Sequence, residues 1–139
     1  MKTIKIILIT ISTIFVMLSS CDTNNKYFDT RLKVINNSDK AIYADFYQSY
    51  PDTTLSKLFH FANSAHKVMP HETFTLGRGG TWEQAFQEQI YQKLLVYIFD
   101  AVVVDNTPWD TIRKNYLILK RYELTLKELD SLNFKIIYP

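Results

Sequence analysis

The stretch LLVYIF, residues 94–99, is apolar at every position and has no polar face to turn toward solvent. A short apolar run that is rich in β-branched and aromatic residues is typical of a strand covered on both faces. We therefore expect this stretch to be the central strand of a sheet, with a hydrophobic layer on each side. Such a strand needs neighbours on both edges, and the flanking sequence supplies candidates.

Five further segments have the character of strands. In AIYADFY (41–47) the even-numbered positions are apolar, while the odd-numbered ones carry Tyr43, Asp45 and Tyr47. This alternation assigns the two sets to opposite faces of a strand. RLKVI (31–35) alternates in the same way, and the turn-forming NNSDK (36–40) predicts that residues 32–47 form a hairpin. The remaining candidates are ETFTL (72–76), YLILKRYEL (116–124) and FKIIY (134–138).

Three helix starts are predicted from capping residues. Thr81 is followed three positions later by Gln84, and Thr125 by Glu128, which is the pattern of a capping box. Thr107 before Pro108 predicts an N-cap followed by proline at the first helical position. The expected buried positions are Trp82, Ala85, Phe86 and Ile90 in the first helix, Trp109 and Ile112 in the second, and Leu126, Leu129 and Leu132 in the third. Asn133 is expected to end the last helix in a left-handed conformation.

These elements predict a mainly β fold. Successive strands separated by helices only late in the chain favour a small antiparallel β-sandwich of about six strands, with short helices in the connections. A two-layer α+β fold is the alternative. Residues 48–71 have no clear pattern, although Asp52 or Thr54 could cap a helical turn that includes Leu55, Leu58 and Phe59.

The N-terminal segment is predicted to be an export signal. Lys2 and Lys5 precede the apolar run from Ile6 to Leu18. At about 1.5 Å per residue, this run is roughly 20 Å long, which is too short for a bilayer core of about 30 Å. We expect a signal peptide over 1–20, a polar tether over 21–29 and a single globular domain over 30–139.

LSSC, residues 18–21, ends in Cys21, the single cysteine of the chain, and resembles the bacterial lipobox. The resemblance implies cleavage between Ser20 and Cys21, a diacylglycerol on the Cys21 sulfur and an acylated amino group, for example with palmitate. Several acyl chains would anchor the protein firmly in a membrane. Its expected location is the bacterial cell envelope, with the outer membrane favoured.

Net charge argues against a nucleic-acid partner. The 16 Lys and Arg exceed the 14 Asp and Glu by two, and Lys2 and Lys5 in the predicted signal account for that excess. The exported protein is therefore formally neutral and lacks the basic footprint of a nucleic-acid-binding domain.

Few residues suggest chemistry. His60, His66 and His71 have neither the i, i+4 spacing nor the cysteine neighbours that are typical of a zinc site, so we expect no metal and no cofactor. Gly79, Gly80 and Thr81, in the glycine-rich GRGGTW, are a candidate anion site at a helix start, although a tight turn explains the glycines equally well. Glu83 and Glu88 are five positions apart and do not face each other on a helix, so they are not a catalytic pair. Asp105 and Asp110 flank a predicted helix cap, where acids have a structural reason to be, and no catalytic residue is assigned.

An exposed row of tyrosines is the main candidate for a contact surface. Tyr43 and Tyr47 lie on the face opposite the apolar positions of their segment, and Tyr50 follows. Tyrosine is suited to contact with proteins and glycans. The favoured interpretation, however, is that these residues form a second, partly buried face of a sandwich.

The segments ILKRYELTLKELDSLNFKIIYP (118–139), YPDTTL (50–55) and LVYIFD (95–100) resemble small uncharacterised lipoproteins that are abundant in Bacteroides-type bacteria. The resemblance implies an envelope location and brings no active site with it. It favours a non-enzymatic domain that binds a protein or glycan partner. The alternative is a small envelope hydrolase or a lysozyme-inhibitor-like protein.

The same resemblance implies O-glycosylation where Asp-Ser/Thr is followed by a small apolar residue or threonine. The pattern occurs at residues 52–54, 110–112 and 130–132. Because the last two sites fall within predicted helices, Thr53 in a predicted loop is the expected acceptor.

Overall fold

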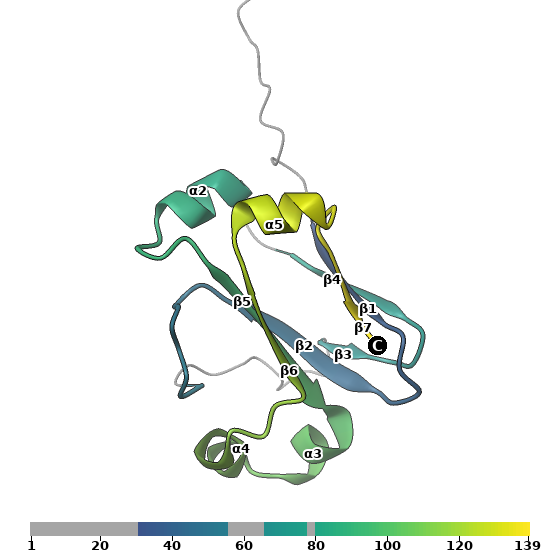
Figure 1. Ribbon diagram of the computed structural model, residues 1–139. Helices are drawn as coiled ribbons and strands as arrows, with labels where there is room; N and C mark the ends of the chain where they lie inside the picture. The colour runs from purple at the N-terminus through teal and green to yellow at the C-terminus, as the bar shows by residue number, and fades with distance from the viewer. Residues whose placement is uncertain (1–30, 56–65, 78–79) are drawn as a thin grey trace, which may run out of the picture.

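The computed structural model describes residues 31–55, 66–77 and 80–139, which form two sheets and four short helices (Figure 1). The three-stranded sheet has the order β4-β1-β7 and the four-stranded sheet the order β3-β2-β5-β6. The strands are β1 (Leu32–Asn36), β2 (Ile42–Tyr47), β3 (Lys67–Val68), β4 (Thr73–Leu76), β5 (Leu94–Asp100), β6 (Lys120–Leu124) and β7 (Lys135–Tyr138). The helices are α2 (Trp82–Gln87), α3 (Ala101–Asn106), α4 (Trp109–Asn115) and α5 (Leu126–Ser131).

The predicted mainly β fold, with short helices in the connections, is confirmed. All strand pairs are antiparallel except β1 with β7, in which Val34 lies opposite Ile136. The described residues contain seven strands rather than six, because β3 occupies part of the unassigned region 48–71. The strand expected over 116–124 begins only at Lys120, since Tyr116 adopts a left-handed conformation that ends α4.

Strand β5 is central, as expected, with β2 on one edge and β6 on the other. Its residues from Leu94 to Phe99 are all fully buried. Even-numbered residues of β5 face the three-stranded sheet, and odd-numbered residues face the opposite side. The four-stranded sheet is therefore covered on both faces, and each face belongs to a separate hydrophobic cluster.

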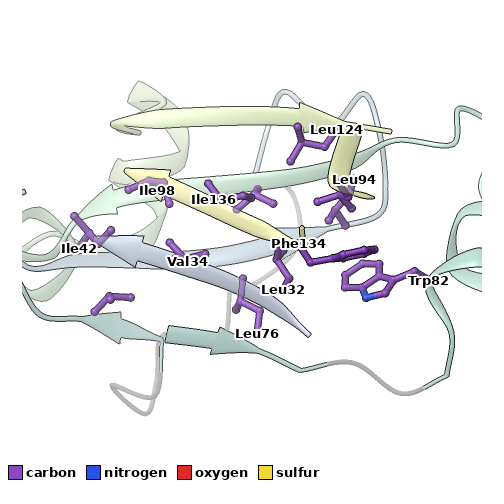
Figure 2. Close-up of a cluster of buried hydrophobic side chains, with 14 of the residues drawn as sticks. Leu32, Val34, Ile42, Leu76, Trp82, Leu94, Ile98, Leu124, Phe134 and Ile136 are labelled. Carbon is purple, nitrogen blue, oxygen red and sulfur yellow. The ribbon is translucent and has the colours of Figure 1, made fainter. Parts of the chain in front are cut away.

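The inner cluster fills the space between the two sheets (Figure 2). It is mainly aliphatic, and Leu32, Val34 and Ile136 of the three-stranded sheet meet Ile98 and Leu94 of β5 within it. Trp82 and Phe134 close one end, where their ring centroids lie 5.9 Å apart. The first residue of α2 and the residue before β7 therefore join the helices to the core.

The outer cluster is more aromatic and is covered by α3, α4 and a loop. It comprises Tyr43, Leu55, Leu95, Tyr97, Phe99, Ala101 and Ile112, with Trp109 packed against it. Phe99 and Trp109 meet edge to face at 5.9 Å. The expectation that Ile112 would lie on the buried side of its helix is confirmed.

The predicted hairpin of residues 32–47 is wrong, because β1 and β2 belong to different sheets. The side chain of Asn36, which is fully buried, accounts for the crossing. Its Nδ2 donates to the carbonyls of Lys40, Val68 and Met69 at 2.7, 3.1 and 3.1 Å. Its Oδ1 accepts from the Ser38 backbone N and from Ser38 Oγ. This amide satisfies backbone groups where the chain leaves one sheet for the other.

Both predicted capping boxes are present. The Thr81 hydroxyl accepts from Gln84 N at the start of α2, and the Thr125 hydroxyl accepts from Glu128 N at the start of α5. Trp82, Ala85, Phe86 and Leu129 are buried as expected, and Asn133 has the expected left-handed φ of 50°. Ile90 and Leu132 are instead 92% and 45% exposed, because α2 ends at Gln87 and α5 at Ser131, before either residue.

The third predicted helix start is wrong in detail. Thr107 is the C-cap of α3, and Pro108 precedes α4 without a side-chain cap. The preceding helix was not expected, because Val102 to Val104 have low helix propensity. It begins where Asp100 Oδ1 accepts from Val102 N at 2.7 Å and from Val103 N at 3.3 Å. A strong N-cap therefore overrides the weak propensity of the three valines.

Candidate functional site

A groove with a volume of about 510 Å³ lies between α2 and α5. The two helices are neighbours at one end of the molecule (Figure 1). The wall from α2 carries Glu83, Phe86 and Gln87, which share one helical face because they are three or four positions apart. Phe86 is buried in the inner cluster, whereas Gln87 is exposed. The groove therefore has an apolar floor and a polar rim on this side.

The opposite wall comes from the first turn of α5. Thr125, Leu126 and Lys127 line it. The Thr125 hydroxyl is occupied by the capping box, in which it also donates to Glu128 Oε2 at 2.8 Å. Hydrogen bonds from the Thr125 backbone N–H and side chain hold the pKa of Glu128 below its ordinary value. On this wall Lys127 is the side chain whose charged group can reach a ligand.

The turn after α2 completes the groove with Tyr91 and Gln92. Tyr91 is 57% exposed, and its ring meets that of Tyr50 edge to face at 5.4 Å. Lys93 Nζ lies 4.5 Å from the centre of the Tyr50 ring and 3.4 Å from Glu123 Oε2. Contact with Tyr50, then with Glu123, raises the pKa of Lys93. A chain of contacts starting at β6 therefore holds Tyr91 at the rim.

No protein-family model, curated protein or solved structure matches the chain.

Tyr43 and Tyr47 do not form an exposed surface. Tyr43 is 4% exposed, and Tyr43 and Tyr47 pack in the outer cluster under the helical cover. The favoured interpretation, a second, partly buried face, is correct for these two residues. Tyr50 packs against the same cluster but also supports Tyr91. Of the three predicted tyrosines, Tyr50 is therefore the one connected to the groove.

A polar cluster joins α3 to the edge of the four-stranded sheet. The Tyr43 hydroxyl donates to Asp105 Oδ1 at 2.8 Å, and Lys67 Nζ donates to Asp105 Oδ2 at 2.5 Å. The bond from Lys67 and then that from Tyr43 lower the pKa of Asp105, and burial raises the pKa of Tyr43. A tyrosine with a raised pKa is a poor base or nucleophile at neutral pH, so the arrangement indicates a structural contact.

His66 and His71 contact different carboxylates. His66 Nδ1 lies 3.5 Å from Asp45 Oδ1, and His71 Nε2 lies 3.4 Å from Asp39 Oδ1 on an exposed loop. His60 lies outside the described residues. Within the described ranges, no three His, Cys, Asp or Glu side chains are arranged to hold a metal ion.

The glycine-rich candidate is partly described. Gly79 lies outside the described residues, as does Cys21 with the predicted signal and tether. Gly80 has a φ of 75°, which glycine adopts without strain, and Thr81 is 4% exposed. Because Thr81 bonds to Gln84, its observed role is to begin α2.

Thr53 follows the end of β2 outside any helix or strand and is exposed, as expected. Thr111 and Ser131 are exposed within α4 and α5. In the described part of the chain no helix is both long and apolar enough to cross a membrane.

The sequence interpretation missed most of the groove. Glu83 had been considered only as half of an acid pair, and Gln87, Tyr91, Gln92 and Lys127 were not singled out. The two capping boxes indicated where both helices begin, but pairing α2 with α5 depends on contacts between residues about forty positions apart. The one local signal of the groove was Tyr91, an aromatic residue that follows the first predicted helix and lies between Gln89 and Gln92 in the sequence.

Proposed function

We propose that this protein is a lipid-anchored domain of the bacterial cell envelope that binds a protein or glycan partner without catalysing a reaction. The groove between α2 and α5 is the observation that supports binding. It combines a buried apolar floor, a half-exposed tyrosine and polar side chains from three segments. Concave sites of this kind, with a few convergent polar groups, are the usual places for ligands.

The proposed location is supported by the sequence. LSSC at 18–21 agrees with the lipobox at all four positions, and the resemblance to lipoproteins of Bacteroides-type bacteria points to the same compartment. In this proposal Cys21 carries the lipid and holds the domain at a membrane surface, most simply the outer membrane.

A hydrolytic function finds less support in the groove. Hydrolysis by paired carboxylates requires two acids a few ångströms apart with different pKa values. Among the groove-lining residues, all of which belong to the described ranges, Glu83 is the one carboxylate. A hydrolase would need its second acid from another part of the chain.

Crosslinking in intact cells tests the binding function. A photo-crosslinking amino acid at Gln87, which lines the groove, should yield a discrete adduct. The matched control is Glu88, the next residue, which is exposed but does not line the groove. Equal adducts from both positions, or none from either, would contradict binding in the groove.

The anchor is tested separately. Labelled palmitate should enter the wild-type protein and not Cys21→Ser. Equal labelling of the two would end the lipoprotein proposal and leave the binding function to be judged by crosslinking.

We also propose Thr53 as an O-glycan acceptor, because it is exposed in a loop where an enzyme can reach its hydroxyl. Mass spectrometry of the native peptide that contains Thr53 should show an added glycan. An unmodified mass throughout excludes this site.

A further inference from the structure

The groove between α2 and α5 has a specific chemical inventory. The charged and amide side chains that line it are those of Glu83, Gln87, Gln92 and Lys127. Amides both donate and accept hydrogen bonds, a carboxylate accepts, and an ammonium donates. Such a set suits a ligand whose groups both donate and accept hydrogen bonds. Hydroxyl groups have this property.

Tyr91 adds a flat apolar surface to this set. An edge-to-face contact with Tyr50 covers at most one face of the ring, and Tyr91 remains 57% exposed. Because Tyr50 is itself held by Lys93, part of the ordering cost of Tyr91 is met before any ligand arrives. A fixed, exposed tyrosine at the mouth of a polar groove provides a platform for a ring with one apolar face.

From these two features we propose that the groove binds a neutral carbohydrate chain. The proposal rests on the binding function above and names the class of its ligand. One sugar ring lies against Tyr91, and its hydroxyls bond to Glu83, Gln87, Gln92 and Lys127. The floor at Phe86 and Leu126 contacts the C–H groups of the neighbouring ring.

Charge disfavours ionic ligands. Glu83 and Lys127 give the lining one formal charge of each sign, so it attracts neither polyanions nor polycations strongly. An anionic polymer would face the Glu83 carboxylate, and a basic peptide would face Lys127. A neutral polymer avoids both repulsions.

The shape of the lining also disfavours the common modes of peptide recognition. An amphipathic peptide helix needs a continuous apolar channel, and an extended peptide needs an unpaired strand edge. The groove is lined by two helices and a turn, and polar residues interrupt its apolar floor. A protein partner remains the competing outcome of the test.

The test measures binding of the full-length chain, immobilised in detergent, to soluble polymers. The neutral probes are β-glucan, xylan, mannan and galactan, and the charged probes are polygalacturonate and polylysine. We expect at least one neutral probe to bind and both charged probes to bind more weakly. Tyr91→Ala should weaken binding of that probe at least tenfold, a loss of about 1.4 kcal/mol. Glu83→Gln should also weaken it.

Each variant has a matched control on the same segment. Ile90→Ala alters the neighbouring residue, which is 92% exposed and does not line the groove, and Glu88→Gln removes the other carboxylate close to α2. The affinity of both controls for the probe should stay within about twofold of the wild-type affinity. That change is small beside the tenfold loss expected for Tyr91→Ala. Because all four side chains are at least partly exposed, the variants should keep the wild-type melting temperature.

The outcomes separate the two proposals. Failure of every neutral probe to bind, or binding that Tyr91→Ala leaves unchanged, overturns the carbohydrate assignment. If the Gln87 crosslinker then captures a protein in cells while Glu88 does not, the binding function stands with a protein ligand. If neither crosslinker yields an adduct, both proposals fail.

Discussion

The inner and outer faces of the four-stranded sheet are both buried, yet they differ in composition and in what covers them. The inner face presents Ile42, Ala44, Val96 and Ile98 to another sheet, so its contacts are between aliphatic side chains of strands. The outer face presents tyrosines and Phe99 to helices and a loop. Its tyrosines carry hydroxyls that bond to the cover, as Tyr43 does to Asp105 and Tyr97 to the Asp52 carbonyl.

This difference explains why the sequence alone left two interpretations of the tyrosine row open. Alternation along a strand shows that two faces exist, but it does not show which face meets solvent. On the outer face, Tyr43 and Tyr97 bury their rings and use their hydroxyls to fix elements that lie above the sheet. Polar atoms on that face therefore indicate attachment of a cover. The inner face, with few polar atoms, holds the two sheets together by packing.

The largest expected effect is on the inner face. Deletion of residues 134–139 removes β7 together with Phe134 and Ile136, which are 4% and 2% exposed. Each buried side chain contributes about 1.5–3 kcal/mol, against a total stability of about 5–15 kcal/mol. With the β1–β7 hydrogen bonds also lost, the deletion should abolish cooperative thermal unfolding, as monitored by circular dichroism.

The matched control for the deletion is Ile137→Ala, because Ile137 belongs to the same strand but is 55% exposed. Its melting temperature should remain close to that of the wild type. A truncated chain that still unfolds cooperatively near the wild-type midpoint would show that β7 does not support the inner core.

Two adjacent leucines of β5 compare the faces directly. Leu94 lies in the inner cluster and Leu95 in the outer one, and both are fully buried. Substitution of a buried leucine by alanine costs about 2–5 kcal/mol, and the cost rises with the cavity that remains. We expect Leu94→Ala in the upper half of this range, because two sheets and Trp82 restrict collapse. Leu95→Ala should fall in the lower half, because short helices and the segment that ends at Leu55, rather than a second sheet, cover that face.

Urea unfolding of the two alanine variants measures this difference. A larger loss from Leu95→Ala than from Leu94→Ala would mean that the helical cover is the more rigid of the two coverings.

The hydroxyls of the outer face should contribute less. The Tyr97 hydroxyl donates to the Asp52 carbonyl at 2.6 Å, and burial raises the pKa of Tyr97. Tyr97→Phe leaves that carbonyl without this donor and should cost about 1–2 kcal/mol in urea unfolding. In Tyr43→Phe, Asp105 keeps its bond to Lys67, so the loss should be smaller. If Tyr97→Phe is as stable as the wild type, the hydroxyl does not secure the loop.

Local patterns predicted much of this fold. Alternation identified the faces of β1 and β2, and the two capping boxes gave the starts of α2 and α5. Pairing between distant segments could not be predicted in this way. Lys33 lies opposite Lys135 in a parallel pair, and nothing in either local sequence specifies that partner.

The missed features have the same origin. The crossing at Asn36 depends on carbonyls of Val68 and Met69, more than thirty residues away. The groove depends on the placement of α5 beside α2, and on Tyr50 reaching Tyr91. Tertiary contacts therefore bring the groove-lining side chains together. The local sequence around each of these residues indicates at most a helix end or a loop.

The smallest expected effect is electrostatic and belongs to the outer face. Asp105 on α3 contacts Lys67 of β3 and Tyr43 of β2. Its pKa lies below the ordinary 3.8, first because of Lys67. The pKa of Lys67 is raised above 10.5, first by the bond to Asp105. The two directions agree, since each charge favours the ionised form of the other.

A carboxylate with a lowered pKa stabilises the fold at pH values above its unfolded pKa, and this contribution is lost as pH falls through the folded pKa. For a lysine with a raised pKa, the contribution is present below the unfolded pKa and is lost as pH rises through the folded pKa. Asp105→Asn should therefore be less stable than the wild type by a constant amount between about pH 5 and pH 9. The difference should shrink below about pH 4. Because the Asp105 side chain is 39% exposed, solvent screening should keep the effect below that of Tyr97→Phe.

Measuring both proteins at each pH isolates this contribution from that of Glu128, whose lowered pKa also reduces stability in acid. Free energies of unfolding from urea titrations at a series of pH values provide the comparison. Added salt should reduce the difference at neutral pH, since the pair is partly exposed. If the difference in free energy of unfolding between the wild type and Asp105→Asn persists unchanged at low pH, Asp105 holds α3 by shape and hydrogen bonding. Charge would then contribute nothing to the outer cover, and both faces of the sheet would depend on uncharged contacts.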